Sequence, residues 1–439
     1  MMRILQIIPG TANFYCGSCI RDTALARGLK TFGHDVVIAP MYLPLYSDEQ
    51  EIDVNHTIFF GGINVYLQQK SNIFHTTPRW FDRWFDAEWL LKASAKKADM
   101  TKASELGEMT VSMLKGEEGR QAKELKRLLA WLKEQEPFDV ALLSNGMLLG
   151  LAGPIKTALN IPIACTLQGE DAFLDALLEP YRTEVWRLLS SQARNVDALI
   201  PVSHYYAEVL QKKLHLASHP CFTVQNGITL DGYGELESPP AVPVLGYLAR
   251  MCKMKGLDTL VEAFIRLKQN PEFQSLTLKI AGSKTNADEP FVRDLENRLR
   301  ERQLLDQVSF HPNLTRDAKI QFLKSLSVFS VPATYGESFG LYVLEAMAAG
   351  VPVVQPRHGG FPEILERTNG GVLFAADQMD SYVAALANVL SDPQAARRMG
   401  EQGRKAVYEN FSLERMTRDI LRVFERIRSS HSAHQTGGE

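Results

Sequence analysis

Short apolar runs alternate with amphipathic segments along most of the chain. Each run predicts a buried strand, and the segment after it carries apolar residues at helical spacing. The predicted strands cover residues 3–8, 33–40, 139–143, 161–167 and 198–202 in a first series, and 244–248, 276–281, 308–310, 328–331 and 351–355 in a second. Parallel strands that are buried on both faces read as continuous apolar runs and are joined by helices, so the pattern predicts α/β sheets of the doubly wound, Rossmann-like kind.

The two series of strands predict two domains. A chain of 439 residues with 45% hydrophobic content is long enough to form two cores. The proline-rich stretch LESPPAVP at residues 236–243 lies between the series and is the expected linker. The expected organisation is a first domain at 1–235 with a helical insertion at about 77–136, a second domain at 244–413, a helix at 414–428 that crosses back to the first domain, and a disordered tail at 429–439.

Composition narrows the function. The net charge is −3 and no long basic run occurs, which disfavours nucleic acid as the main partner and favours small molecules. The N-terminal apolar run is too short for a secretion signal, and no stretch of eighteen apolar residues occurs, so we expect a cytoplasmic protein.

Five cysteines fit a reducing compartment, and only Cys16 and Cys19 form a Cys-x-x-Cys pattern. A redox or metal role for this pair is an alternative to small loop residues that pack close to a ligand.

The most specific stretch is YGESFGLYVLEAMAAGVPVVQ at residues 335–355. It predicts a loop, a helix that begins just after Glu337, and a buried strand. The first amides of that helix, at Ser338, Phe339, Gly340 and Leu341, are expected to bind an anion such as a phosphate. Glu337 before the helix and Glu345 within it would stand roughly 10–12 Å apart, a spacing that suits the two ends of a nucleotide-sugar.

Other candidate ligand residues follow predicted strands, where the loops of a parallel sheet collect at one edge. Arg250 and Lys255 come after the strand at 244–248 and precede a helix that begins at Gly256, so they would place two cations beside an anion; Lys253 is a rival for the lysine. The further candidates are Gly17, Gln168, Glu170, Asp171, Gly282 and Asn313. Glu170 or Asp171 would orient a hydroxyl acceptor or cap a helix.

The stretch at 335–355 resembles the Glu-x7-Glu signature of retaining GT-B glycosyltransferases, most closely family 4. The resemblance implies two Rossmann-like domains that face each other across a cleft, with Arg250 and Lys255 on the donor diphosphate, Glu337 on the transferred sugar and Glu345 on the ribose. It also implies donor contacts at Gly17, in the loop after the first strand, at Asn226, in an Asn-Gly turn that ends the first domain, and at Asn313, in a nucleobase pocket. Gln168 stands where the family often has a histidine that contacts the sugar or acceptor.

The expected activity is therefore transfer of a sugar from a nucleoside-diphosphate sugar, with a UDP-sugar as the expected donor, to a hydroxyl acceptor on a sugar, a small molecule or a lipid-linked group. No Asp-x-Asp pair occurs in the chain, so we expect neither a metal nor a cofactor, with protein cations and helix amides stabilising the leaving diphosphate. By resemblance, the reaction retains the anomeric configuration.

Three other functions stay open. They are a phosphorylase or epimerase on the same fold, a non-catalytic sugar-nucleotide binding protein, and a thiol redox protein built on Cys16 and Cys19. Trp80, Phe81, Trp84 and Phe85 form an aromatic stripe on a predicted helix. Such a stripe favours packing inside the protein, with peripheral contact at the inner membrane face as the alternative.

Overall fold

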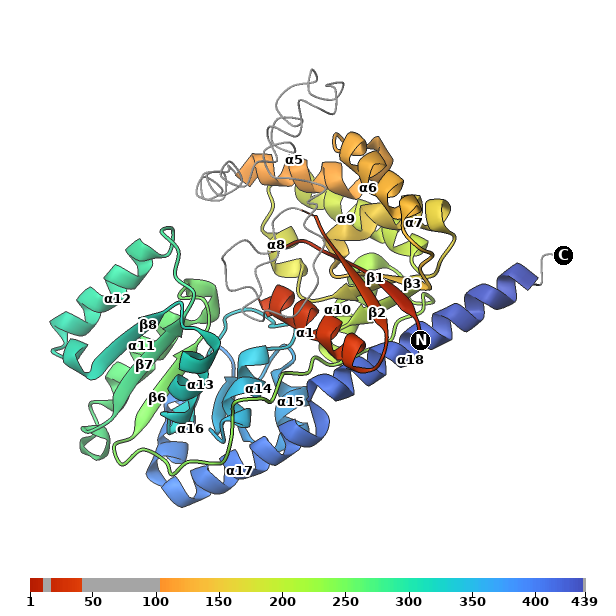
Figure 1. Cartoon of the computed structure of the whole chain (residues 1–439). Coiled ribbons are helices and arrows are strands. Elements are labelled where there is room, and N and C mark those ends of the chain that lie inside the picture. Colours follow the sequence, from red (N-terminus) through yellow and green to blue (C-terminus); the bar gives the residue numbers. More distant parts are fainter. Residues whose placement is uncertain (11–16, 42–102, 437–439) are drawn as a thin grey trace. The chain divides into compact units, whose positions relative to one another are not determined.

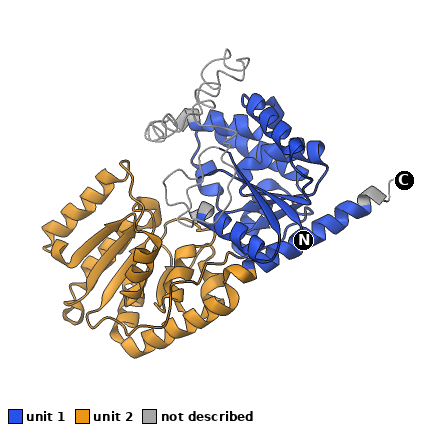
Figure 2. Cartoon of the chain, viewed as in Figure 1, with its two compact units in different colours: residues 1–225, 416–439 blue, residues 226–415 orange. Residues whose placement is uncertain are grey.

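The computed structural model describes residues 1–10, 17–41 and 103–436, which form two compact units (Figure 1). Unit 1 comprises residues 1–225 and 416–439, and unit 2 comprises residues 226–415 (Figure 2). Cys16 and the aromatic stripe of the expected insertion lie outside the described residues. Each unit is an α/β fold built on one parallel sheet, as the alternating pattern of the sequence predicts.

Unit 1 is built on a parallel sheet that has five strands within the described residues, in the order β2-β1-β3-β4-β5. The strands are β1 (Arg3–Ile8), β2 (Asp35–Pro40), β3 (Val140–Leu143), β4 (Ile163–Leu167) and β5 (Ala198–Pro201). The helices are α1 (Gly17–Thr31), α5 (Ala103–Leu114), α6 (Ala122–Glu134), α7 (Ala152–Leu159), α8 (Asp171–Asp175), α9 (Tyr181–Gln192) and α10 (His204–Leu214), with short 3-10 turns η3 (Gly116–Glu118), η4 (Gly146–Leu151) and η5 (Ala193–Asn195). Strands β3, β4 and β5 are buried along their whole length, which explains their uninterrupted apolar sequences.

Unit 2 is built on a parallel sheet with the order β11-β10-β9-β6-β7-β8. The strands are β6 (Val244–Leu248), β7 (Thr277–Gly282), β8 (Val308–Pro312), β9 (Val328–Phe329), β10 (Val353–Pro356) and β11 (Gly371–Phe374). The helices are α11 (Leu257–Leu267), α12 (Glu289–Glu301), α13 (Arg316–Lys324), α14 (Leu341–Ala348), α15 (Phe361–Thr368), α16 (Met379–Ser391) and α17 (Pro393–Asn410), with 3-10 turns η6 (Lys253–Lys255), η7 (Pro271–Phe273) and η8 (Leu305–Gln307).

The strand orders place a topological switch point in each sheet. In unit 2 the chain moves outward from β6 to β7 and β8, and then returns to the other side of β6 to form β9. In unit 1 the chain moves from β1 to β2 and returns to form β3 on the other side of β1. Loops that leave the carboxyl ends of strands on either side of such a point diverge and leave a crevice, which is where doubly wound folds bind ligands.

The units divide at Gln225 and Asn226, about ten residues before the expected linker. The proline-rich stretch packs with unit 2, where Glu237 pairs with Lys324 at 2.8 Å. Just before it, the Gly234 carbonyl accepts a hydrogen bond from Arg404. A proline-rich stretch predicts a linker because proline has no backbone N–H to donate to a helix or sheet. Here the side chains of Lys324 and Arg404 nevertheless bind the stretch and a residue just before it to unit 2.

The last helix, α18 (Leu413–Thr436), corrects the expectation of a disordered tail from residue 429 (Figure 1). Its residues from Met416 onward belong to unit 1. Arg428 donates to Asp139 at 2.8 Å and the His431 ring contacts the Asn160 carbonyl at 3.1 Å, so polar contacts extend the helix beyond its apolar stripe. None of the helices in the described ranges is long and apolar enough to cross a membrane.

Candidate functional site

The loops that follow β6 and β9 are joined to each other at the switch point of unit 2. The Thr334 amide donates to the Met254 carbonyl at 3.0 Å. Gly256 has a φ of +70°, and a Cβ on it would lie 1.8 Å from the Pro332 carbonyl oxygen. Only glycine fits this close approach, and it carries the chain from η6 into α11. The two loops therefore present their side chains at one place on the sheet edge.

Lys255 from the first loop and Glu337 from the second form a partly buried cluster with two tyrosines. Lys255 Nζ pairs with Glu337 Oε2 and donates to the Tyr335 hydroxyl at 2.5 Å. The hydroxyls of Tyr335 and Tyr342 donate to the same carboxylate oxygen at 3.1 and 2.9 Å. Three donors thus converge on Oε2, while no described residue donates to the other oxygen of Glu337.

The electrostatics of this cluster keep both members of the pair charged. Burial opposes ionisation of Lys255, but the Glu337 carboxylate outweighs it and raises the lysine pKa well above its usual value. Burial likewise opposes the Glu337 carboxylate, but Lys255 and the tyrosine hydroxyls hold its pKa below the usual value. The rival lysine, Lys253, is exposed on η6. The structure thus brings Lys255 to Glu337 and leaves Lys253 at the surface.

Arg250 lies on the same loop and is held by an acidic partner that the sequence reasoning missed. Its Nε lies 3.2 and 3.1 Å from the two carboxylate oxygens of Asp288, which is buried beside the start of α12. Burial raises the pKa of Asp288, but Arg250 and the donors of Thr285 overcome it, so the pKa is lowered. The Arg250 side chain is about half exposed, at 52%, and so remains accessible to an anion from solution.

Helix α14 begins later than the sequence pattern predicts. Its first residue is Leu341, and Gly340 precedes it with a φ of +96°. This left-handed residue separates the loop at Ser338 and Phe339 from the helix, which corrects the expectation that the helix begins just after Glu337. The Phe339 side chain is buried in unit 2 with its ring 6.3 Å from that of Phe411, so it belongs to the core of this unit.

A glycine pair after β10 supports the loop that carries Glu337. The Gly360 amide donates to the Glu337 carbonyl at 2.8 Å. Gly359 has a φ of +61°, and a Cβ on it would lie 2.6 Å from the same oxygen. A third strand end therefore fixes the position of Glu337, although sequence reasoning had not singled out these glycines.

Glu345, the second carboxylate of the Glu-x7-Glu spacing, forms an ion pair of its own. Its Oε1 accepts a hydrogen bond from Lys319 Nζ of α13 at 2.5 Å. Both side chains are largely buried, with 13% of Glu345 and 8% of Lys319 exposed. The structure therefore gives each of the two glutamates its own lysine.

Gly282 ends β7, Asn313 follows the last residue of the neighbouring strand β8, and the two residues contact each other. The Asn313 amide donates to the Gly282 carbonyl at 3.0 Å, and Asn313 has a left-handed φ of +55°. Gly282 has a φ of +138°, and a Cβ on it would lie 1.7 Å from the Ala249 carbonyl oxygen. Asn226, the first residue of unit 2, is buried.

Among the candidate side chains of unit 1, Glu170 is the most enclosed. Glu170 is buried and its carboxylate accepts from the amides of Gly146, Gln168 and Gly169 at 2.9, 2.9 and 3.0 Å. The Tyr206 hydroxyl also donates to it at 2.8 Å. These four donors make Glu170 the support of its loop, and its side chain forms no cap hydrogen bond with α8. The acceptor role of Glu170 stays a prediction.

Asp171 and Gln168 are less enclosed than Glu170. Asp171 opens the short helix α8, and burial raises the pKa of its carboxyl. Gln168 Nε2 donates to the Ser144 carbonyl at 2.6 Å and lies 3.4 Å from Asp22 of α1. Gly17 is the first residue of α1. Asp171 is therefore the less buried of the two adjacent carboxyl groups of this loop.

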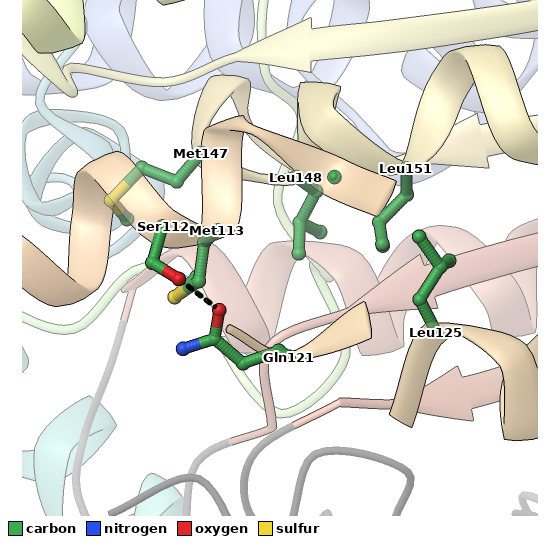
Figure 3. A pocket seen from close by; sticks show the side chains of 8 residues that line it. Ser112, Met113, Gln121, Leu125, Met147, Leu148 and Leu151 are labelled. Carbon is green, nitrogen blue, oxygen red and sulfur yellow. Dashed lines mark hydrogen bonds between the residues drawn. The ribbon is translucent and has the colours of Figure 1, made fainter. Parts of the chain in front are cut away.

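A separate cavity in unit 1 is a poor candidate for a substrate site. It has a volume of about 10 Å³ and lies among Ser112, Gln121, Met147 and neighbouring apolar side chains (Figure 3). The Ser112 hydroxyl donates to Gln121 Oε1 at 2.6 Å. A cavity of this size accommodates about one water molecule.

Two family models match the chain and agree with this architecture. Residues 234–406 match the glycosyl transferases group 1 family, and residues 106–231 match Glycosyltransferase Family 4. The chain has the GT-B fold of glycosyltransferases. The lipopolysaccharide core mannosyltransferase LpsB of Rhizobium meliloti is 31% identical over 42% of this chain and 52% of its own length. The uncharacterized glycosyltransferase YqgM of Bacillus subtilis is 27% identical over 69% of this chain and 82% of its own length.

Solved structures share the fold across nearly the whole chain. Sucrose-phosphate synthase from Thermosynechococcus elongatus superposes with a TM-score of 0.69 at 18% identity, covering 98% of this chain and all of that one. Anabaena HepE in complex with UDP and glucose gives 0.66 at 15% identity, covering 97% of this chain and all of that one. The chain spans about half the length of several curated relatives, including LpsB.

Proposed function

We propose that this glycosyltransferase moves a sugar from a nucleoside-diphosphate sugar to a hydroxyl acceptor, with retention of the anomeric configuration and without a metal ion. The observation that carries the proposal is the Lys255–Glu337 ion pair at the switch point of unit 2, with Arg250 on the same loop as Lys255. It offers two cations for a diphosphate and one carboxylate oxygen for sugar hydroxyls. A UDP-sugar is the proposed donor, because the HepE complexes contain UDP or UDP-glucose.

In this proposal the two cations stabilise the negative charge that develops on the leaving nucleoside diphosphate. Arg250 is anchored by Asp288 and still half exposed, so it can bind a phosphate oxygen without reorganising. Lys255 is charged and held by Glu337 and Tyr335, and it would share its protons between the carboxylate and the phosphate. These charges would serve the purpose that a divalent ion serves in metal-dependent transferases.

The carboxylates would recognise the two ends of the donor. Glu337 has one oxygen saturated by three donors, which leaves the other for the hydroxyls of the transferred sugar. Glu345 would bind the ribose. In unit 1, Asp171 and Gln168 are the proposed contacts of the acceptor. A donor phosphate oxygen would take the proton of the acceptor hydroxyl while the new bond forms on the face from which the diphosphate leaves.

Two measurements test this proposal. Thermal unfolding in the presence of UDP, GDP, ADP and their sugars should give a raised melting temperature with one nucleoside, since a ligand that binds the native state stabilises it. Donor turnover in EDTA, with the anomeric configuration of the product read by NMR, should show metal-free transfer with retention. Loss of turnover in EDTA that magnesium or manganese restores would contradict the metal-independent mechanism, and an inverted product would contradict retention.

A sugar-nucleotide binding protein without activity is the second candidate, favoured by Gln168 at the position where histidine is frequent in the family. Tight donor binding with neither transfer nor hydrolysis would support it. A phosphorylase would instead be recognised by sugar transfer to inorganic phosphate.

A further inference from the structure

Lys319 is the unexpected member of the carboxylate arrangement in unit 2. It lies in the first turns of α13, a helix whose N-terminus is capped by Thr315, two residues after Asn313. The side chain reaches α14 and pairs with Glu345 Oε1 at 2.5 Å. A buried lysine thus links the helix that follows the β8 loop to α14, the helix that carries the second glutamate of the signature.

Lys319 contacts only one of the two carboxylate oxygens of Glu345, which leaves the other for a ligand. Lys319 is engaged with one oxygen of Glu345, and no described residue donates to the other. With 13% of its side chain exposed, Glu345 is mostly withdrawn from water yet still accessible. A largely buried carboxylate without a cation would destabilise the folded state, because no interaction would compensate for its desolvation. Lys319 therefore supplies the counter-charge of the Glu345 carboxylate and holds one of its two oxygens.

We infer that Lys319 is a positioning residue that sets the selectivity of this site for ribonucleotides over 2′-deoxyribonucleotides. The inference rests on the proposed function, in which Glu345 binds the ribose. A carboxylate oxygen fixed in one direction accepts from the ribose hydroxyls, and a sugar without the 2′-hydroxyl leaves part of that capacity unfilled. Without Lys319 the carboxylate is free to turn toward water, and the distinction between the two sugars fades.

The same helix offers a matched control. Lys324 ends α13 and is also mostly buried, with 10% of its side chain exposed, but it pairs with Glu237 of the proline-rich stretch. Lys324→Met removes the same functional group from the same helix and leaves Glu345 untouched. Lys319→Arg is the conservative variant, because it keeps the positive charge at the position.

The experiment is calorimetric titration of the full chain and its variants with UDP and with 2′-deoxy-UDP. We expect the wild type to bind UDP tenfold to a hundredfold more tightly, as for one hydrogen bond to a charged group. Lys319→Met should reduce this ratio to about threefold or less, Lys319→Arg should restore most of it, and Lys324→Met should leave it unchanged. In a Glu345→Gln background, Lys319→Met should have no further effect on the ratio.

The ratio separates positioning from simple stabilisation. If Lys319 only stabilised unit 2, Lys319→Met would lower the melting temperature but leave the ratio unchanged, because the unfolded fraction weakens both apparent affinities equally. That result overturns the inference and leaves the proposed function standing. Absence of binding to the wild type by UDP, and equally by GDP and ADP, would instead overturn the proposed function and the inference together.

Discussion

Removing Lys255 should destabilise unit 2 as well as weaken ligand binding, because it leaves the Glu337 carboxylate without a counter-ion. Glu337 is 9% exposed, and the tyrosine hydroxyls that remain are neutral. Breaking a buried ion pair on one side typically costs about 3–5 kcal/mol, and the 20% exposure of Lys255 favours the lower end. For a unit of this size, about 3 kcal/mol corresponds to roughly 6–12 °C in melting temperature.

The assay is urea unfolding of three variants against the wild type. Lys255→Ala should lose about 3 kcal/mol, and the double variant Lys255→Ala/Glu337→Gln should recover part of that loss because no buried charge remains. Lys253→Ala is the control, since Lys253 lies exposed on the same turn, and its effect should stay within about 0.5 kcal/mol.

The loss of stability caused by Lys255→Ala should also grow as pH rises. In the wild type, burial opposes the Glu337 carboxylate but Lys255 lowers its pKa, so the stabilisation is present above the unfolded-state pKa and lost as pH falls through the folded one. In Lys255→Ala, burial acts without the ammonium and raises the folded pKa, so stability is lost as pH rises through it. The difference in the free energy of unfolding between wild type and Lys255→Ala should therefore be larger at about pH 8 than at about pH 5. Equal loss at both, or full stability of Lys255→Ala, would refute this reasoning.

Three further predictions concern the same sheet edge. Asp288→Asn should weaken UDP binding by about tenfold in calorimetry, since it leaves Arg250 without its anchoring charge; unchanged binding would show that the guanidinium positions itself. Gly282→Ala should lower the free energy of unfolding by more than about 2 kcal/mol, because its Cβ would overlap the Ala249 carbonyl, and a native melting temperature would contradict that. Donor turnover should survive EDTA at an undiminished rate, measured by release of the nucleoside diphosphate.

The fold could be predicted from the sequence because its signals are local. The run at 276–281 matches β7 (Thr277–Gly282) to within a residue, because alternating apolar residues mark its buried face. Boundaries were predicted less well where a single backbone conformation decides them. Gly340 turns left-handed and delays α14 to Leu341, and a pattern of apolar positions carries no information on that dihedral angle.

The candidate site could be predicted only in part, because each predicted side chain has partners distant in sequence. Arg250 and Lys255 were identified by their place after a strand, whereas Asp288 and Lys319 have no distinguishing local pattern. Tyr342 occupies a helical position that reads as an ordinary surface or core residue, and only the fold brings its hydroxyl to Glu337. The choice between Lys253 and Lys255 likewise needed the left-handed Gly256 that turns the chain after them.

The most direct test of the account is calorimetry of Glu337→Gln and Glu345→Gln with free UDP and with UDP-glucose. Both ligands carry the ribose, so Glu345→Gln should weaken both alike, by roughly tenfold or more. Glu337→Gln should spare free UDP, weaken the nucleotide-sugar and lower turnover, because only the sugar end of the donor meets this carboxylate. Equal losses for Glu337→Gln with the two ligands would contradict the assignment of Glu337 to the transferred sugar.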